Sequence, residues 1–135
     1  MRLTPAQIDT IKSTAQAVLA QRGNLAFAVL VGSRAAGTAH EGSDWDIAFQ
    51  WSKSVSATDK LGATELLRQD LRHALQVNEN QVDLIDLADA RLAMCALVAE
   101  EGQVLVVNDE LAWVRFLKTT WFELEDHYWR EQHAA

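Results

Sequence analysis

The sequence predicts an α/β (α+β) fold in which a small sheet is flanked by helices and the chain ends in a long helix. Two apolar stretches, residues 25–31 and 45–51, have the length and composition of buried strands. A helical pattern over residues 59–76 leads to a third such stretch, residues 82–87, and this strand–helix–strand order indicates a crossover onto the same sheet. Residues 1–135 are predicted to form one domain, because this length suffices to bury a core.

Helix boundaries are marked along the whole chain. The first helix is predicted to begin at Thr4, which forms a capping box with Gln7 and is followed by Pro5 at the first helical position, and to end at Gly23. The helix over residues 59–76 has an apolar stripe that comprises Leu61, Leu67, Leu71 and Leu75, with Leu66 beside it. A helix over residues 88–101, a short strand over 103–107 and a last helix, capped by Asn108 and running to about residue 131, complete the chain.

The stretch at residues 44–51 alternates between two kinds of side chain. Because neighbouring residues of a strand point to opposite faces, one face carries Trp45, Ile47, Phe49 and Trp51, and the other carries Asp44, Asp46, Ala48 and Gln50. Two carboxylates two residues apart lie roughly 6.5–7 Å apart along a strand. Such a pair can converge on Mg²⁺, which prefers oxygen ligands and binds substrate phosphates in its remaining positions.

A glycine turn precedes these carboxylates and a third acid follows them. Gly32 and Ser33 stand where the first strand ends, and glycine lets a backbone approach a phosphate closely. Arg34 either reaches a phosphate or is a solvated surface arginine. The third acid is Asp83 or Asp86, which face opposite sides of a strand; we favour Asp83 because it lies in mid-strand. Together these residues suggest a site for a metal–nucleoside triphosphate.

The arrangement resembles a known family. Gly32-Ser33, ten residues and then Asp44-Trp45-Asp46 match the Gly-Ser and Asp-x-Asp signature of the polymerase-beta-like nucleotidyltransferase superfamily. The chain looks like its minimal branch, the MNT domain proteins, and within that branch like the MntA-like antitoxins of HEPN/MNT toxin–antitoxin systems. The resemblance implies a polymerase-beta-like fold with a small mixed sheet.

The resemblance also implies a reaction. Asp44, Asp46 and Asp83 would be catalytic and would hold two Mg²⁺ ions, which Mn²⁺ can replace, while Gly32, Ser33 and Arg34 would bind the nucleotide. The protein would transfer AMP from ATP to a tyrosine of a HEPN ribonuclease toxin, with which it would form a hetero-oligomer. Two alternatives remain: an antitoxin that neutralises the toxin by binding alone, and a nucleotidyltransferase that modifies a small molecule such as an antibiotic.

The last helix has two apolar stripes. One is expected to pack on the domain, with Trp113 at its margin, and comprises Val114, Leu117, Trp121, Leu124 and Tyr128. The other, which includes Leu111, Phe122 and Trp129, is turned about 80–100° away. This second stripe either widens the packing face or binds a protein partner through Phe122 and Trp129, since aromatic residues dominate binding hot spots.

The composition limits the kinds of molecule that the protein is expected to bind and the cellular compartment in which we expect it. A formal net charge of −7 argues against direct binding of nucleic acid, which relies on clustered Lys and Arg. No apolar run approaches the length of a membrane span, and the N-terminus has no signal-peptide pattern. The single cysteine, Cys95, excludes an internal disulfide and is interpreted as a small buried apolar residue. We therefore expect a cytoplasmic protein.

Overall fold

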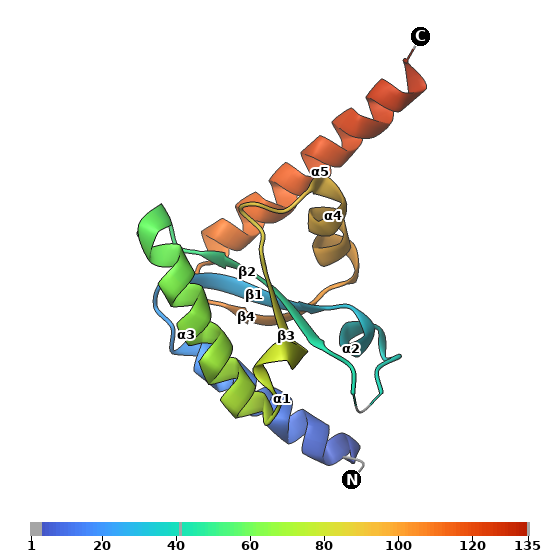
Figure 1. The fold of residues 1–135 in the computed structure, drawn as a ribbon. Helices are drawn as coiled ribbons and strands as arrows, with labels where there is room; N and C mark the ends of the chain where they lie inside the picture. Colours follow the sequence, from blue (N-terminus) through green and yellow to red (C-terminus); the bar gives the residue numbers. More distant parts are fainter. Residues whose placement is uncertain (1–3, 41, 135) are drawn as a thin grey trace.

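The computed structural model of the protein describes residues 4–40 and 42–134. In this part of the chain, helices cover both faces of a four-stranded sheet (Figure 1). The elements are α1 (Pro5–Ala20), β1 (Leu25–Val31), α2 (Ser33–Ala36), β2 (Trp45–Trp51), α3 (Ala57–Leu75), the 3₁₀ helix η1 (Glu79–Gln81), β3 (Val82–Asp86), α4 (Leu92–Glu101), β4 (Gln103–Val107) and α5 (Glu110–Gln132). None of the described helices combines the length and the apolar character that a membrane span needs.

The sheet is mixed, with the strand order β3-β2-β1-β4. β1 pairs antiparallel with β2 and with β4, whereas β2 and β3 run parallel and are joined by α3. This crossover and the predicted fold class are confirmed. Because β1 has strands on both sides and helices over both faces, every residue from Leu25 to Val31 is buried.

Two apolar layers enclose the sheet. The layer under α1 and α3 receives the side chains of Trp45, Ile47, Phe49 and Trp51, and the layer under α4 and α5 receives Ala48, so the predicted alternation of β2 is confirmed. The prediction for α3 is partly wrong. Leu61 is 76% exposed and Leu66 is 62% exposed, because they lie about 80° and 140° around the helix from the centre of the buried stripe.

The first helix begins as predicted, and the later boundaries differ. Thr4 caps α1 through the expected capping box. The cap of α5 is Asp109 and not Asn108, since the Asp109 carboxylate accepts a hydrogen bond from the backbone N–H of Ala112 at 3.1 Å. The Asn108 amide instead donates to carbonyls at the junction of α1 and β1. α4 begins only at Leu92, because the residues after β3 form a turn.

The predicted packing face of α5 is also wrong in part. The helix packs through Trp113, Phe116 and Thr120, with the Phe27 ring 4.9 Å from that of Trp113 and 5.4 Å from that of Phe116. The predicted packing residues Val114, Trp121 and Tyr128 are exposed, whereas Leu117 and Leu124 are half-buried. Figure 1 shows the reason: the second half of α5 projects beyond the sheet.

Candidate functional site

The turn after β1 lies against Asp46 of β2. Gly32 has φ 75° and ψ −156°, a conformation that is essentially restricted to glycine. A Cβ atom at this position would lie 2.3 Å from the Asp46 Oδ2 atom. The turn between β1 and α2 therefore needs glycine for two reasons, and its backbone touches the carboxylate of Asp46.

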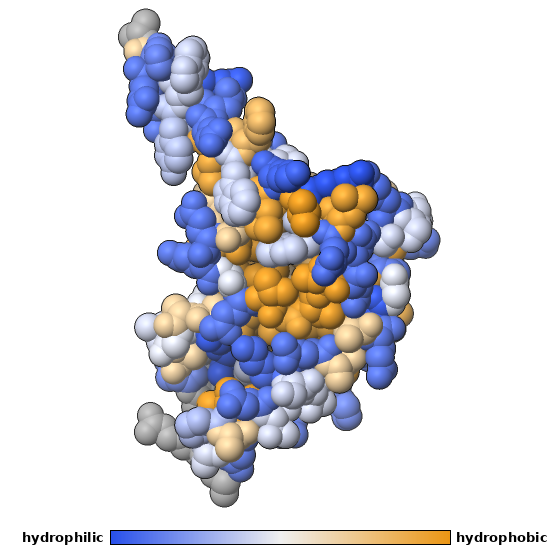
Figure 2. All heavy atoms as spheres, turned by 180° about the vertical axis from the view of Figure 1, so that it is seen from behind, coloured by the Kyte–Doolittle hydropathy of each residue, from blue (hydrophilic) through white to orange (hydrophobic). Residues whose placement is uncertain are grey.

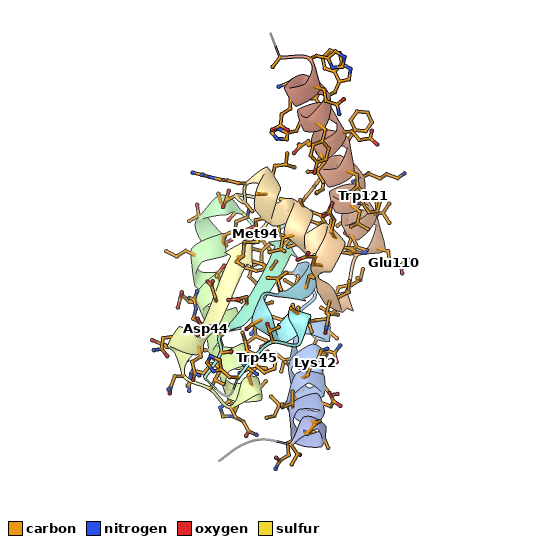
Figure 3. All side chains as sticks on the ribbon, turned by 90° about the vertical axis from the view of Figure 1, so that its right-hand side faces the viewer. Lys12, Asp44, Trp45, Met94, Glu110 and Trp121 are labelled. Carbon is orange, nitrogen blue, oxygen red and sulfur yellow. The ribbon has the colours of Figure 1, made fainter. Side chains whose placement is uncertain are left out.

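Three carboxylates gather on one face of the sheet beside this turn. Asp44 immediately precedes β2, Asp46 is the second residue of that strand, and Asp83 of β3 is its register partner. Residues two apart on a strand share a face, and so do register partners in a parallel pair. The structure thus places the three predicted acids on the same face, at the end of the sheet opposite to Trp121 of α5 (Figure 3 labels Asp44 and Trp121).

This geometry agrees with the comparison to known proteins. Residues 13–111 match the family described as polymerase beta, nucleotidyltransferase. The chain belongs to this nucleotidyltransferase family. A search of curated protein sequences gave no match.

Solved structures of toxin–antitoxin complexes contain chains of the same fold. One, crystallised with AMP-PNP, is 28% identical over 90% of this chain and 93% of that chain, with a TM-score of 0.64. A mutant of an MntA toxin–antitoxin complex is also 28% identical with the same coverage, at a TM-score of 0.61. The third is a tri-AMPylated HEPN toxin of Shewanella oneidensis in complex with an MNT antitoxin, 25% identical over 90% of this chain and 91% of that chain, with a TM-score of 0.58.

The register of β3 separates the two candidates for the third acid of this nucleotidyltransferase. Asp86 pairs with Phe49, three residues beyond the pair of Asp46 and Asp83, and therefore lies on the opposite face of the sheet. Its Oδ1 atom accepts a hydrogen bond from the backbone N–H of Ala88 at 3.0 Å, and its Oδ2 atom lies 3.9 Å from the Lys60 Nζ atom. Asp86 thus holds the turn after β3, and Asp83 is the acid beside Asp46.

The electrostatics of the site favour a bound cation. Partial burial raises the pKa of the Asp46 carboxyl, and the negative charges of Asp83 and Asp44 raise this pKa further. Across residues 4–40 and 42–134, no three His, Cys, Asp or Glu side chains converge closely enough to form a ready-made metal site. Three carboxylates on one face are nevertheless the oxygen donors that Mg²⁺ prefers, so the chemistry of the donor set fits this ion.

The raised pKa of Asp46 predicts how pH acts on this site. Because the native state holds the Asp46 proton more tightly than the unfolded state does, this group favours the metal-free fold most at low pH. That contribution is lost as the pH rises through the native pKa. Metal binding should have the opposite dependence, since a protonated Asp46 is a poor ligand. We expect the stabilisation by Mg²⁺ to fall as the pH is lowered from about 8 to about 4, measured as the shift in melting temperature.

A matched variant checks this assignment. Asp46→Asn should remove the pH dependence of the metal effect, whereas Asp86→Asn, which alters a carboxylate on the other face, should retain it. An unchanged pH profile in Asp46→Asn would assign the titration to another group.

Arg34 lies near Asp44, and its guanidinium is directed at the backbone of the residue before it. Its Nε and Nη2 atoms donate to the Ser43 carbonyl oxygen at 3.2 and 2.9 Å, and its guanidinium carbon lies 4.2 Å from the centroid of the Trp45 ring. Ser43 is buried, and its hydroxyl accepts a hydrogen bond from the His40 backbone N–H at 2.9 Å. Sequence reasoning missed Ser43; its place directly before Asp44 in a polar connection was the available signal.

A cavity of about 470 Å³ adjoins the connection between α2 and β2. Its polar lining includes Lys12, Arg34 and His40, and the buried ring of Trp45 forms part of its wall. Because Trp45 and Asp46 point to opposite faces of β2, this cavity lies on the other face of the sheet from the three carboxylates.

The two aromatic residues predicted to bind a partner are exposed. Phe122 is 78% exposed and Trp129 is 59% exposed, and the Trp129 ring stacks on that of His133 with a centroid separation of 4.1 Å. Neither residue contributes to the buried core, so the alternative in which this stripe widens the packing face is not seen. Figure 2 shows a broad apolar area on the face turned away in Figure 1, below the projecting end of α5.

Proposed function

We propose that this nucleotidyltransferase is an antitoxin that transfers AMP from ATP to a tyrosine of a cognate HEPN ribonuclease toxin and so neutralises it. The observation that carries the proposal is the register of Asp46 with Asp83, which puts three carboxylates on one face beside the Gly32 turn. With ATP as the nucleotide, we expect the reaction to take place in the cytoplasm.

The similar structures support a HEPN toxin as the acceptor. The structure with AMP-PNP contains an ATP analogue together with a toxin–antitoxin pair, and the Shewanella oneidensis structure contains an AMPylated HEPN toxin with its MNT antitoxin. Both cover 90% of this chain, and the family match over residues 13–111 includes the candidate site from Gly32 to Asp83. These likenesses support AMP as the transferred group and a HEPN toxin as its recipient.

The residues of the site have distinct roles in this reaction. Asp44, Asp46 and Asp83 would hold two Mg²⁺ ions, or Mn²⁺ in their place. When bound, these ions neutralise phosphate charge and lower the pKa of the attacking hydroxyl. The Gly32–Ser33 backbone and the Ser33 hydroxyl bind the β- and γ-phosphates, so that the leaving group is stabilised.

The chemistry balances as a single displacement. The tyrosine oxygen forms a bond to the α-phosphorus of ATP while the bond from this phosphorus to the bridging oxygen breaks. Pyrophosphate leaves, and the tyrosine proton passes to solvent. The products are AMP-tyrosine and pyrophosphate.

Radiolabel transfer tests the proposal directly. The protein is incubated with a co-expressed HEPN toxin and with ATP labelled at the α-phosphate or, in a parallel sample, at the γ-phosphate. We expect only the α-label to reach the toxin, with a mass increase of one or more AMP units on a tyrosine. Label from the γ-phosphate would indicate phosphorylation instead, and neutralisation without any label would indicate an antitoxin that acts by binding alone.

The exposed stripe on α5 favours direct binding as a part of the function. Aromatic side chains that protrude from a helix with nothing to pack against are typical of binding hot spots. We therefore propose that Phe122 and Trp129 contact the toxin in the hetero-oligomer. Binding through α5 and chemistry at the sheet end are compatible, since they use separate parts of the chain.

A single substitution measures this contact. Trp129→Ala should weaken the complex by about 2 kcal/mol or more and barely change the stability of the isolated chain, because Trp129 is exposed. Phe116→Ala is the control: Phe116 is buried on the same helix, so its truncation should cost about 3–5 kcal/mol of folding stability. Binding isotherms and denaturation curves give both quantities. Undiminished toxin binding by Trp129→Ala would exclude this residue from the interface.

A further inference from the structure

Arg34 holds the residues on both sides of Asp44. Two hydrogen bonds from its guanidinium reach the carbonyl oxygen of Ser43, at 3.2 Å from Nε and 2.9 Å from Nη2. The same group lies 4.2 Å from the ring centroid of Trp45, within the range of a cation–π interaction. Ser43 and Trp45 are the chain neighbours of Asp44. The Arg34 side chain therefore contacts the backbone of the residue before Asp44 and the ring of the residue after it.

Arg34 and the two residues that it contacts are each held in place by other interactions. Arg34 belongs to α2, where the backbone N–H groups of Ala35 and Ala36 donate to the Gly32 carbonyl at 3.1 and 3.0 Å. Ser43 and Trp45 are buried, with exposed fractions of 8% and 5%. Arg34 thus ties the glycine turn to the start of β2 across a connection whose middle, from Gly37 to His40, lies outside any helix or strand.

We infer that Arg34 is a positioning residue, which sets the carboxylate of Asp44 at a fixed place relative to the Gly32–Ser33 turn. The inference rests on the proposed function, in which the turn binds the triphosphate and Asp44 holds the metal ions. The geometry needs a guanidinium, since only a planar fork can donate two hydrogen bonds to one carbonyl oxygen and lie over an indole ring at the same time. A lysine ammonium at this position keeps the charge but loses both the fork and the stacking surface.

The substitution Arg34→Lys tests this role. We expect the dissociation constant for Mn²⁺ alone, measured by electron paramagnetic resonance, to rise about tenfold or more, as it does when partners of metal ligands are lost. The affinity for ATP in the absence of divalent ions should change by less than about twofold. The rate constant for AMP transfer at saturating ATP should fall about a hundredfold, the effect of a misplaced group. Arg22→Lys is the matched control; this arginine pairs with Asp70 and precedes the start of β1, whereas α2 follows the end of that strand, so the substitution should change none of these quantities.

A phosphate-binding Arg34 would give the reverse result. In that case Arg34→Ala would weaken ATP binding without divalent ions, Arg34→Lys would restore most of it, and Mn²⁺ binding would be unchanged in both. That outcome overturns the inference.

A second variant keeps the test decisive if Arg34→Lys is less stable than the parent. Trp45→Phe leaves the hydrogen bonds to Ser43 in place and weakens the stacking, so the Mn²⁺ dissociation constant should rise about two- to fivefold. An unchanged constant would contradict the inference. The measurements of Mn²⁺ and ATP binding need no acceptor protein. They therefore remain valid if no AMP is transferred to the toxin. That result would contradict the proposed function but not the role of Arg34.

Discussion

Replacing Asp44 or Asp46 by Asn is expected to slow AMP transfer by about a thousandfold, which corresponds to roughly 4 kcal/mol of transition-state stabilisation. Asn keeps the size and one carbonyl oxygen of Asp but removes the charge, which is what a divalent cation chiefly binds. Asp83→Asn should also be strongly impaired, since Asp83 is the register partner of Asp46. The measurement is the single-turnover rate of AMP transfer to the toxin at saturating ATP and Mg²⁺.

Asp86→Asn is the control for this series. Asp86 lies on the opposite face of β3, and an Asn there still accepts the hydrogen bond from the Ala88 N–H, so the rate should be near that of the parent. The double variant Asp44→Asn/Asp46→Asn should melt at the same temperature as the metal-free parent or at a higher one, because it removes repulsion between carboxylates. A double variant with near-native rates would refute two-metal catalysis here, and a clear loss of stability would make the aspartates structural.

Gly32→Ala is expected to have the second-largest effect. An alanine at this position would have to adopt a backbone conformation that costs residues other than glycine about 1–3 kcal/mol. Its Cβ atom would also lie 2.3 Å from the Asp46 Oδ2 atom, so that the carboxylate must move. Because Asp46 and the Gly32–Ser33 turn, which we propose binds phosphate, would both be displaced, the rate of AMP transfer should fall by about a hundredfold or more. Transfer kinetics and a denaturation curve on the same sample give the two effects.

Gly37→Ala separates backbone strain from the clash. Gly37 also has a positive φ, 78°, but among the described atoms nothing lies within 4 Å of a Cβ built on it. We expect it to lose about 1–2 kcal/mol of stability and little of the rate. If Gly32→Ala behaved like Gly37→Ala, the contact between the turn and Asp46 would have no part in catalysis.

The sequence predicted those features that depend on local pattern. The strict alternation of residues 44–51 put Asp46 and Trp45 on opposite faces, and the capping box at Thr4 marked the start of α1. The Gly32-Ser33 and Asp44-Trp45-Asp46 signature resembled the nucleotidyltransferase superfamily, and the family match confirms that resemblance. The strand alternation and the helix cap each have a physical cause that lies within a few residues of chain.

Features that depend on tertiary contacts were not predictable in this way. The periodicity of α5 revealed its apolar residues but not where the sheet beneath it ends, so Trp121 was predicted to pack although it is exposed. The choice between Asp83 and Asp86 depended on the register of β3, and the partners of Arg34 depended on the path of the connection before β2. Asn108 was taken for a cap because its amide partners, far away in sequence, were unknown.

The position of β3 at the edge of the sheet makes the placement of Asp83 sensitive to the register between β3 and β2. In the described sheet, β3 is an outermost strand with a neighbour on one side only, and it carries the third carboxylate. A slip of one residue between β3 and β2 would set Val82 or Leu84 opposite Asp46 and turn Asp83 to the other face. The buried leucines of α3, the helix that precedes β3, therefore hold the alignment of the three carboxylates as well as the core. We expect a substitution that shifts β3 to reduce AMP transfer while β1, at the centre of the sheet, stays buried.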